Sequence, residues 1–186
     1  MTDLPELSWE NELDLVLSAQ QGDKVAFCEL VRIHRNGVIN LLYRMYGDTY
    51  SAEDTAQETF IRAWQKLQSY KPKSPFRNWL YRIATNAALD AIRREREVLD
   101  VDAITIRSQD EGPEAQLETK ETGEQVREAV LRLAPSSRAV LVLREYEGFS
   151  YKEIAETLDI PTGTVMSRLN YARNQLRKSL NQILEG

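Results

Sequence analysis

The sequence predicts an all-α protein with two small helical domains joined by an acidic flexible linker. Apolar residues recur at three- and four-residue spacing along most of the chain, which is the pattern of amphipathic helices. Residues 95–124 hold ten acids against three basic residues and show no sustained apolar period. Near the C-terminus, two short helical patterns are separated by a turn, which predicts a helix-turn-helix in the second domain. We expect the domains at residues 8–97 and 123–184, and the linker at residues 98–122.

Composition limits the classes of function. The chain has 186 residues, 42% of them apolar, and a net charge of -5. Cys28 and His34 are the only cysteine and the only histidine, so an intrachain disulfide is impossible and a Cys/His zinc site lacks ligands. We expect no metal and no cofactor. No signal pattern or membrane-length apolar run is present, which favours a cytoplasmic protein.

Three helices are expected first. A pattern from Ser8 stops at Gly22, and a second, capped by Asp23, runs to Gly47. Gly37, inside the second helix, could mark a bend. Ser51 and Asp54 give a capping signal for the third helix. The third helix would bury Ala56, Phe60, Ala63, Trp64 and Leu67 and expose Asp54, Gln57, Glu58, Arg62 and Gln65.

A loop with two prolines ends the third helix. Pro75 behind Ser74 then suits the start of a fourth helix, expected over about residues 76–97. This helix mixes aromatic and basic residues, a combination that suits unstacked nucleic-acid bases and phosphates. The simpler interpretation is that its aromatic residues belong to the core, and we expect about half of them to be buried.

The second domain begins with helical patterns around Val126 and after Pro135, the latter ending at Gly148. Ser150 and Glu153 then form a capping box for a short helix, which Asp159-Ile160-Pro161 terminates. A last helix starts near Thr162 and would bury Val165, Leu169, Ala172 and Leu176. Its opposite face offers Ser167, Arg168, Asn170, Tyr171, Asn174 and Lys178, and residues 162–178 contain no acid. Such a face suits the major groove of DNA, although an ordinary helical hairpin with a basic solvated face would share the pattern.

Three motifs resemble the bacterial RNA polymerase sigma factors of the extracytoplasmic-function (ECF) group. They are AEDTAQETFIRAW at residues 52–64, FRNWLYRIATN at residues 76–86, and GFSYKEIAETL at residues 148–158 with GTVMSR at residues 163–168. They are similar to regions 2.2, 2.3 to 2.4 and 4.2 of that family, in the same order. The resemblance covers nearly the whole chain and implies a transcription initiation factor that is not an enzyme.

The resemblance also implies partners. Core RNA polymerase would bind through its beta-prime clamp helices and beta flap, with the clamp helices meeting Asp54, Gln57, Glu58 and Arg62. Promoter DNA would be the second partner, and an anti-sigma protein, common in the family, a further one. No membrane insertion is implied.

Two DNA contacts follow from the same resemblance. The -10 element, with promoter melting and a flipped base, would meet Ser74, Phe76, Trp79, Asn86, Asp90, Arg93 and Arg94. The -35 element would meet Thr164, Met166, Ser167, Arg168, Asn170, Tyr171, Arg173 and Lys178. Many family members carry a basic residue where this chain has Met166, so the preferred promoter sequence stays open.

Other functions remain as alternatives. The C-terminal half alone resembles many autonomous helix-turn-helix regulators, but such proteins usually bind DNA as dimers and this chain offers no obvious dimerisation helix. A helical adaptor with no nucleic-acid role is a third possibility. An enzyme fits worst, because the sequence has no phosphate loop, metal-ligand set or nucleophile motif.

Overall fold

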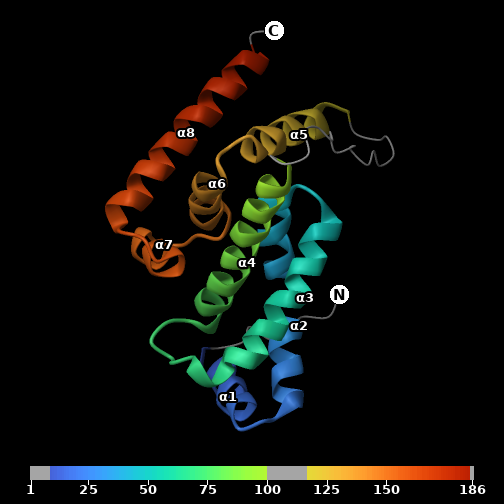
Figure 1. Ribbon diagram of the computed structural model, residues 1–186, viewed down its shortest axis with the longest axis vertical. Helices are drawn as coiled ribbons and strands as arrows, with labels where there is room; N and C mark the ends of the chain where they lie inside the picture. The colour runs from blue at the N-terminus through green and yellow to red at the C-terminus, as the bar shows by residue number, and fades with distance from the viewer. Residues whose placement is uncertain (1–8, 100–116, 185–186) are drawn as a thin grey trace.

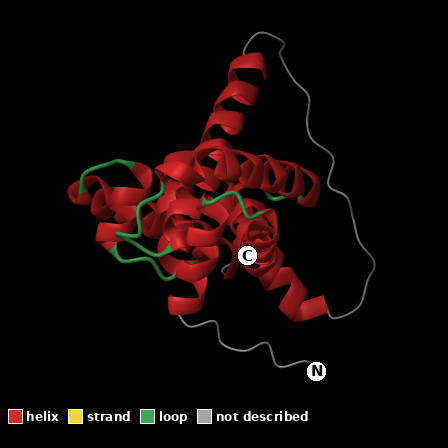
Figure 2. Cartoon of the chain, turned by 90° about the horizontal axis from the view of Figure 1, so that it is seen from below, coloured by secondary structure: helices red, strands yellow, loops and turns green. Residues whose placement is uncertain are grey.

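The computed structural model describes residues 9–99 and 117–184. Within these ranges every regular element is helical, and Figure 2 shows only helices and short loops there. The prediction of an all-α chain is therefore confirmed for the described residues. The short run 101–106, interpreted as linker, lies outside them.

The first domain consists of α1 (Trp9–Gln20), α2 (Lys24–Tyr46), α3 (Thr49–Lys66), the short 3₁₀ turn η1 (Leu67–Ser69) and α4 (Phe76–Leu99). Asp23 caps α2, because its carboxylate accepts hydrogen bonds from the backbone N–H groups of Val25 and Ala26. Gly47 ends α2 in the left-handed conformation, with φ of 83°. The predicted caps of α2 are thus confirmed.

The start of α3 differs from the prediction. Ser51 and Asp54 looked like a capping pair, but the residue at the helix N-cap is Asp48, whose carboxylate accepts from the N–H of Ser51. The capping signal was read three residues too late, because Asp is as good a cap as Ser and Asp48 follows Gly47 directly. Of the predicted buried stripe, Ala56, Ala63 and Leu67 are in the core, and Phe60 and Trp64 are half-buried and pack against it.

Gly37 does not break α2, which is continuous from Lys24 to Tyr46. A Cβ atom at this position would lie 2.5 Å from Oη of Tyr81 on α4. The glycine therefore permits α4 to approach α2 closely, and the predicted bend is replaced by a close contact between helices.

The second domain contains α5 (Leu117–Leu131), α6 (Pro135–Leu141), the π-helical turn η2 (Val142–Tyr146), α7 (Tyr151–Leu158) and α8 (Thr162–Leu184). Pro135 is the first residue of α6, as predicted. Helix α5 begins at Leu117, inside the segment 98–122 that was predicted as linker. The leucine, glutamates and lysine of 117–121 are good helix formers, so high charge did not prevent a helix here.

The two domains pack against each other. Helix α4 contacts both α6 and α7 of the second domain (Figure 1), and α2 contacts α5, η2 and α6. Buried residues form one continuous apolar cluster that includes Leu30 and Leu41 of the first domain and Ile154 and Leu169 of the second. The sequence indicated two domains but gave no sign that their cores would merge.

Candidate nucleic-acid and polymerase interfaces

Helix α8 is oriented by the helix that precedes it. The Ser150 hydroxyl accepts from the Glu153 N–H, while the Glu153 carboxylate accepts from the N–H and hydroxyl of Ser150, so the predicted capping box is present. The hydrogen bonds that the Glu153 carboxylate accepts lower its pKa, and the bond from the Ser150 backbone N–H has the largest effect. Asp159 then closes α7 in the left-handed conformation, with φ of 53°. Three residues separate α7 from α8, which gives the compact turn of a helix-turn-helix.

The two faces of α8 divide as predicted. Val165, Leu169 and Ala172 are buried against the rest of the second domain, and Leu176, the last residue of the predicted stripe, is half-buried. The residues predicted to meet DNA all lie on α8 outside this stripe: Met166, Ser167, Asn170, Tyr171, Arg173 and Lys178 are exposed, and Thr164 and Arg168 are half-buried. Because α8 contains no acid, its outer face can approach phosphate without repulsion.

Some side chains of this face already have partners within the chain. The Arg173 guanidinium binds Oε1 of Glu145 through two nitrogens, at 2.6 and 3.1 Å. The Ser167 hydroxyl donates to the carbonyl of Thr164 at 3.0 Å. DNA binding through Arg173 would therefore compete with Glu145, whereas Arg168 and Lys178 form no ion pair with other residues of 9–99 and 117–184.

Helix α3 presents an acidic face on the first domain. Asp54, Gln57 and Glu58 are exposed, whereas Arg62 is half-buried and paired with Glu58. Arg62 thus neutralises part of the charge next to it. The four residues predicted to meet polymerase share one face of one helix.

Two apolar residues on the same face were missed by the sequence analysis. Tyr50 and Ile61 are 84% and 59% exposed, and with Asp54 and Gln57 they repeat at four-, three- and four-residue steps along α3. The sequence alone could have shown these two residues, because their helical spacing places them on the side of α3 next to the buried stripe. We call Tyr50, Asp54, Gln57, Glu58 and Ile61 the α3 outer face.

The start of α4 contains a cluster of aromatic rings. Phe76 packs its ring on those of Tyr70 and Trp79, with centroid distances of 5.5 and 5.4 Å. Phe76 is only 2% exposed, so its side chain supports this region from the core and offers no surface to a base. Trp79 is half-buried. Burial, with the nearby charge of Glu12, raises the pKa of Tyr70 to about 12.

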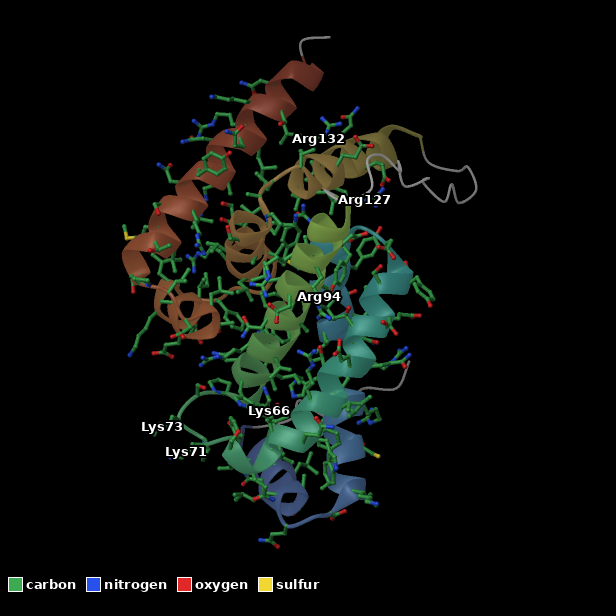
Figure 3. All side chains as sticks on the ribbon, viewed as in Figure 1. Lys66, Lys71, Lys73, Arg94, Arg127 and Arg132 are labelled. Atoms are coloured by element: carbon green, nitrogen blue, oxygen red, sulfur yellow. The ribbon has the colours of Figure 1, made fainter. Side chains whose placement is uncertain are left out.

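The loop before α4 is held at both ends. The Gln20 side-chain amide donates to the carbonyls of Leu67 and Tyr70, and the Tyr70 hydroxyl donates to the Ser74 carbonyl at 2.7 Å. Between these anchors the loop carries Lys71 and Lys73, which Figure 3 shows projecting away from the helices. This fixed loop places two exposed cations beside the half-buried Ser74 and Trp79.

Farther along α4, Asn86, Arg93 and Arg94 are exposed and Asp90 is half-buried. Asp90 accepts from Arg93 through its carboxylate and from Arg94 through its carbonyl, both at 3.3 Å. From Ser74 to Arg94, the predicted -10 residues therefore follow one loop and one helix, with Phe76 withdrawn into the core. Residues 9–99 and 117–184 contain no group of acids, histidine and cysteine suited to a metal, nor any helix long and apolar enough to cross a membrane.

Comparison with known proteins agrees with this arrangement. Residues 30–98 match Sigma-70 region 2, and residues 123–176 match Sigma-70 region 4. The ECF RNA polymerase sigma factor SigW of Bacillus subtilis is 36% identical over 179 residues, covering 90% of this chain and 96% of SigW.

Two solved structures share the fold. The sigma factor RpoE of Bartonella quintana, crystallised with the anti-sigma factor NepR, aligns with a TM-score of 0.70 and 28% identity, covering 83% of this chain and 96% of that chain. CnrH, in complex with the cytosolic domain of CnrY, aligns with a TM-score of 0.69 and 27% identity, covering 90% and 96%. These matches show that the chain belongs to the ECF group of RNA polymerase sigma factors, which direct RNA polymerase to promoters.

Proposed function

We propose that this sigma factor divides its work among three surfaces: the α3 outer face binds polymerase, the loop and α4 meet the -10 element, and α8 reads the -35 element. The observation that carries the proposal is the segregation of charge. The α3 outer face displays Asp54 and Glu58, whereas α8 has no acid along its length. Acidic and acid-free surfaces suit a basic protein partner and DNA respectively.

On the polymerase side, the beta-prime clamp helices are the partner that the family resemblance implies for α3. Tyr50 and Ile61 extend the polar patch with apolar area at its two ends. A stable protein interface needs such apolar surface, because the attraction within a buried charged pair is roughly balanced by the cost of removing both charges from water. The beta flap is the proposed second polymerase contact, on the second domain.

On the DNA side, Arg168 is the residue best placed to read a base. It lies on α8 next to the buried Leu169, which holds this part of the helix backbone in place and so limits where the Arg168 side chain can reach. A bidentate contact to guanine would require such positioning. Asn170 and Tyr171 supply neighbouring polar and aromatic contacts, and Lys178 lies two turns farther along the helix, where phosphate is the expected target.

For the -10 element, Asn86 is the most useful probe of promoter melting. It is exposed and its removal leaves the aromatic cluster at Tyr70, Phe76 and Trp79 intact. We expect Asn86→Ala to bind core polymerase normally and to form open complexes more slowly, as followed by permanganate footprinting. Normal melting by this variant would remove Asn86 from the -10 interface.

The partners and location follow from this assignment. RpoE is crystallised with the anti-sigma factor NepR, and CnrH is seen in complex with the cytosolic domain of CnrY, which supports a regulatory protein partner of the anti-sigma kind for this chain. Promoter recognition takes place where bacterial polymerase works, so we infer action in the cytoplasm. A pull-down with core polymerase, followed by promoter-library selection with the assembled holoenzyme, tests the whole proposal.

A further inference from the structure

Arg173 of α8 is restrained by side chains of the same domain. Oε1 of Glu145 accepts hydrogen bonds from both Nε and Nη2 of the Arg173 guanidinium, at 3.1 and 2.6 Å. These hydrogen bonds, with a smaller contribution from Tyr151, raise the pKa of Arg173. Arg173 belongs to the face of α8 proposed to meet DNA, whereas Glu145 belongs to none of the three proposed surfaces.

The backbone of Glu145 is fixed by the turn that carries it. Glu145 belongs to the π-helical turn η2, whose first two residues, Val142 and Leu143, are fully buried. The next residue, Arg144, donates to the Phe149 carbonyl at 2.7 Å. Turns of this kind are rare and are found frequently at functional sites. Glu145 therefore reaches α8 from a rigid support.

The ion pair leaves part of the Arg173 guanidinium available to another partner. An arginine has five N–H groups, one on Nε and two on each terminal nitrogen. Glu145 binds the Nε group and one group on Nη2, so the second group on Nη2 and both groups on Nη1 are not bound by Glu145. Nη1 and Nη2 together form the end of the guanidinium fork, which can bind two oxygens side by side. Competition between DNA and Glu145 is therefore limited to the Nε side of the guanidinium.

The position of Arg173 along α8 indicates phosphate as its target. Arg173 lies about three turns after Thr162, the first residue of α8, which is roughly 16 Å along the helix axis. Recognition helices contact base edges mainly through their N-terminal residues. Residues farther along such a helix approach the DNA backbone, and contacts to phosphate fix the register and orientation of the protein on the duplex.

We propose that Glu145 determines the specificity of DNA binding by holding Arg173 for a single phosphate of the -35 element. The inference rests on the proposed role of α8. An unrestrained arginine can follow any phosphate and strengthens binding to every DNA sequence alike. An arginine held by a carboxylate loses most of this general attraction, because its charge is balanced, and it binds where two phosphate oxygens match the fixed fork. Glu145 is thus a positioning residue that lowers binding to unrelated DNA more than binding to the promoter.

Glu145→Gln tests this role, because the amide keeps the size of the side chain while removing the charge that balances Arg173. Glu156→Gln is the matched control, with the same charge change on the exposed surface of α7. Arg173→Ala and the Glu145→Gln, Arg173→Ala double variant complete a mutant cycle. Holoenzyme containing each variant is titrated with promoter duplex and with unrelated duplex at several salt concentrations. Circular dichroism establishes that each variant is folded.

For Glu145→Gln, we expect the affinity for unrelated DNA to rise several-fold and the affinity for the promoter to change much less. The slope of log affinity against log salt for unrelated DNA should steepen by roughly 1, because Arg173 becomes an unbalanced cation. The ratio of promoter affinity to unrelated affinity should therefore fall in Glu145→Gln and keep the parent value in Glu156→Gln. When Arg173 is already alanine, the Glu145→Gln change should leave this ratio unaltered.

Neutral methylphosphonates identify the phosphate that Arg173 binds. Each phosphate of the -35 element is replaced in turn, and the parent holoenzyme should lose affinity several-fold at one position whose effect disappears in Arg173→Ala. The loss at that position should be smaller in Glu145→Gln. If the pattern of sensitive phosphates is the same with and without the Arg173 side chain, the proposed contact does not exist.

An unchanged affinity ratio in folded Glu145→Gln would overturn the role of Glu145. An equal fall of the ratio with and without the Arg173 side chain would also overturn it, because Glu145 would then act on DNA by another route. Arg168→Ala distinguishes a failure of the α8 assignment. If promoter selection responds to neither Arg168→Ala nor Arg173→Ala, the assignment and the inference both fail, whereas a response to Arg168→Ala alone overturns only the inference.

Discussion

Helices α3 and α8 resemble each other on the side that faces the core and differ on the side that faces solvent. Each helix buries a stripe of small and branched residues, such as Ala56 and Ala63 on α3 and Val165 and Leu169 on α8. Outside these stripes α3 shows carboxylates and α8 shows cations, amides and a tyrosine. The stripe determines how a helix sits on its domain, and the outer residues determine which macromolecule it can meet.

The largest expected effect follows from reversing the charge of the α3 face. Asp54→Lys with Glu58→Lys should cost several kcal/mol in binding to core polymerase, because the new cations would face cations of the partner. Both residues are exposed, so the free energy of unfolding should change by no more than about 0.5 kcal/mol per site. Pull-down and circular dichroism measure the two quantities.

A matched control uses the neighbouring Glu53, which is exposed on α3 and reaches toward Arg35 on α2. Glu53→Lys should affect polymerase binding much less than the double reversal. Normal binding by the folded Asp54→Lys, Glu58→Lys protein would contradict the assignment of this face to polymerase.

A smaller effect is expected when α8 loses its proposed base contact. Arg168→Ala should weaken binding to the preferred promoter by roughly 1–3 kcal/mol and relax the preference at one base position. The proposed contact partner of Arg168 is a base edge, so binding to unrelated DNA should change much less. Binding-site selection with the holoenzyme measures the effect, and equal discrimination by parent and variant would exclude Arg168 as a reader.

The difference between the two faces was largely visible in the sequence, because both stripes have helical spacing and the outer residues follow from them. Phe76 shows where such an analysis fails. Its position at the start of α4, after a proline loop and among basic residues, indicated base contact, yet its ring is held in the core by Tyr70 and Trp79. Periodicity gives the inward direction along a helix but says little about a helix end, where a loop can cover a ring.

The contact between domains was also beyond the sequence. Arg77 and Glu147, which pair across the two domains, are 70 positions apart in the sequence. Either residue by itself is of a type that usually lies on a solvated surface. Gly37 was similarly interpreted from its local effect, as a bend, although its role depends on Tyr81 of another helix. Local signals identified the helices and most of their caps, although not the cap of α3, whereas tertiary contacts decided which charged residues would pair.

The helix-turn-helix itself provides the next prediction, since its geometry depends on one capping box. Glu153→Ala should lower the free energy of unfolding by about 1 kcal/mol at neutral pH. The hydrogen bonds from Ser150 lower the pKa of Glu153 below its usual 4.5, so its ionised form stabilises the fold above that pH. This stabilisation is lost as pH falls through the lowered pKa.

Urea unfolding of the parent and Glu153→Ala proteins at pH 7 and near pH 3 checks this sign. The difference between them should shrink at the lower pH. Glu156→Ala, on the same helix without the capping role, should show no comparable difference. A gap that widened on acidification would show that the protonated side chain is the stabilising form.

The smallest expected effect separates phosphate contact from base reading on the same helix. Lys178 is exposed in the C-terminal half of α8, and a lysine that only neutralises phosphate releases counterions without regard to sequence. Lys178→Ala should therefore weaken promoter and unrelated DNA alike and reduce the slope of log affinity against log salt by roughly 1. Asn181→Ala, an exposed neutral residue farther along α8, is the control and should leave the slope unchanged. A titration of both DNAs by the holoenzyme at several salt concentrations distinguishes the two roles, because a change in the ratio of the two affinities would make Lys178 a reader of sequence.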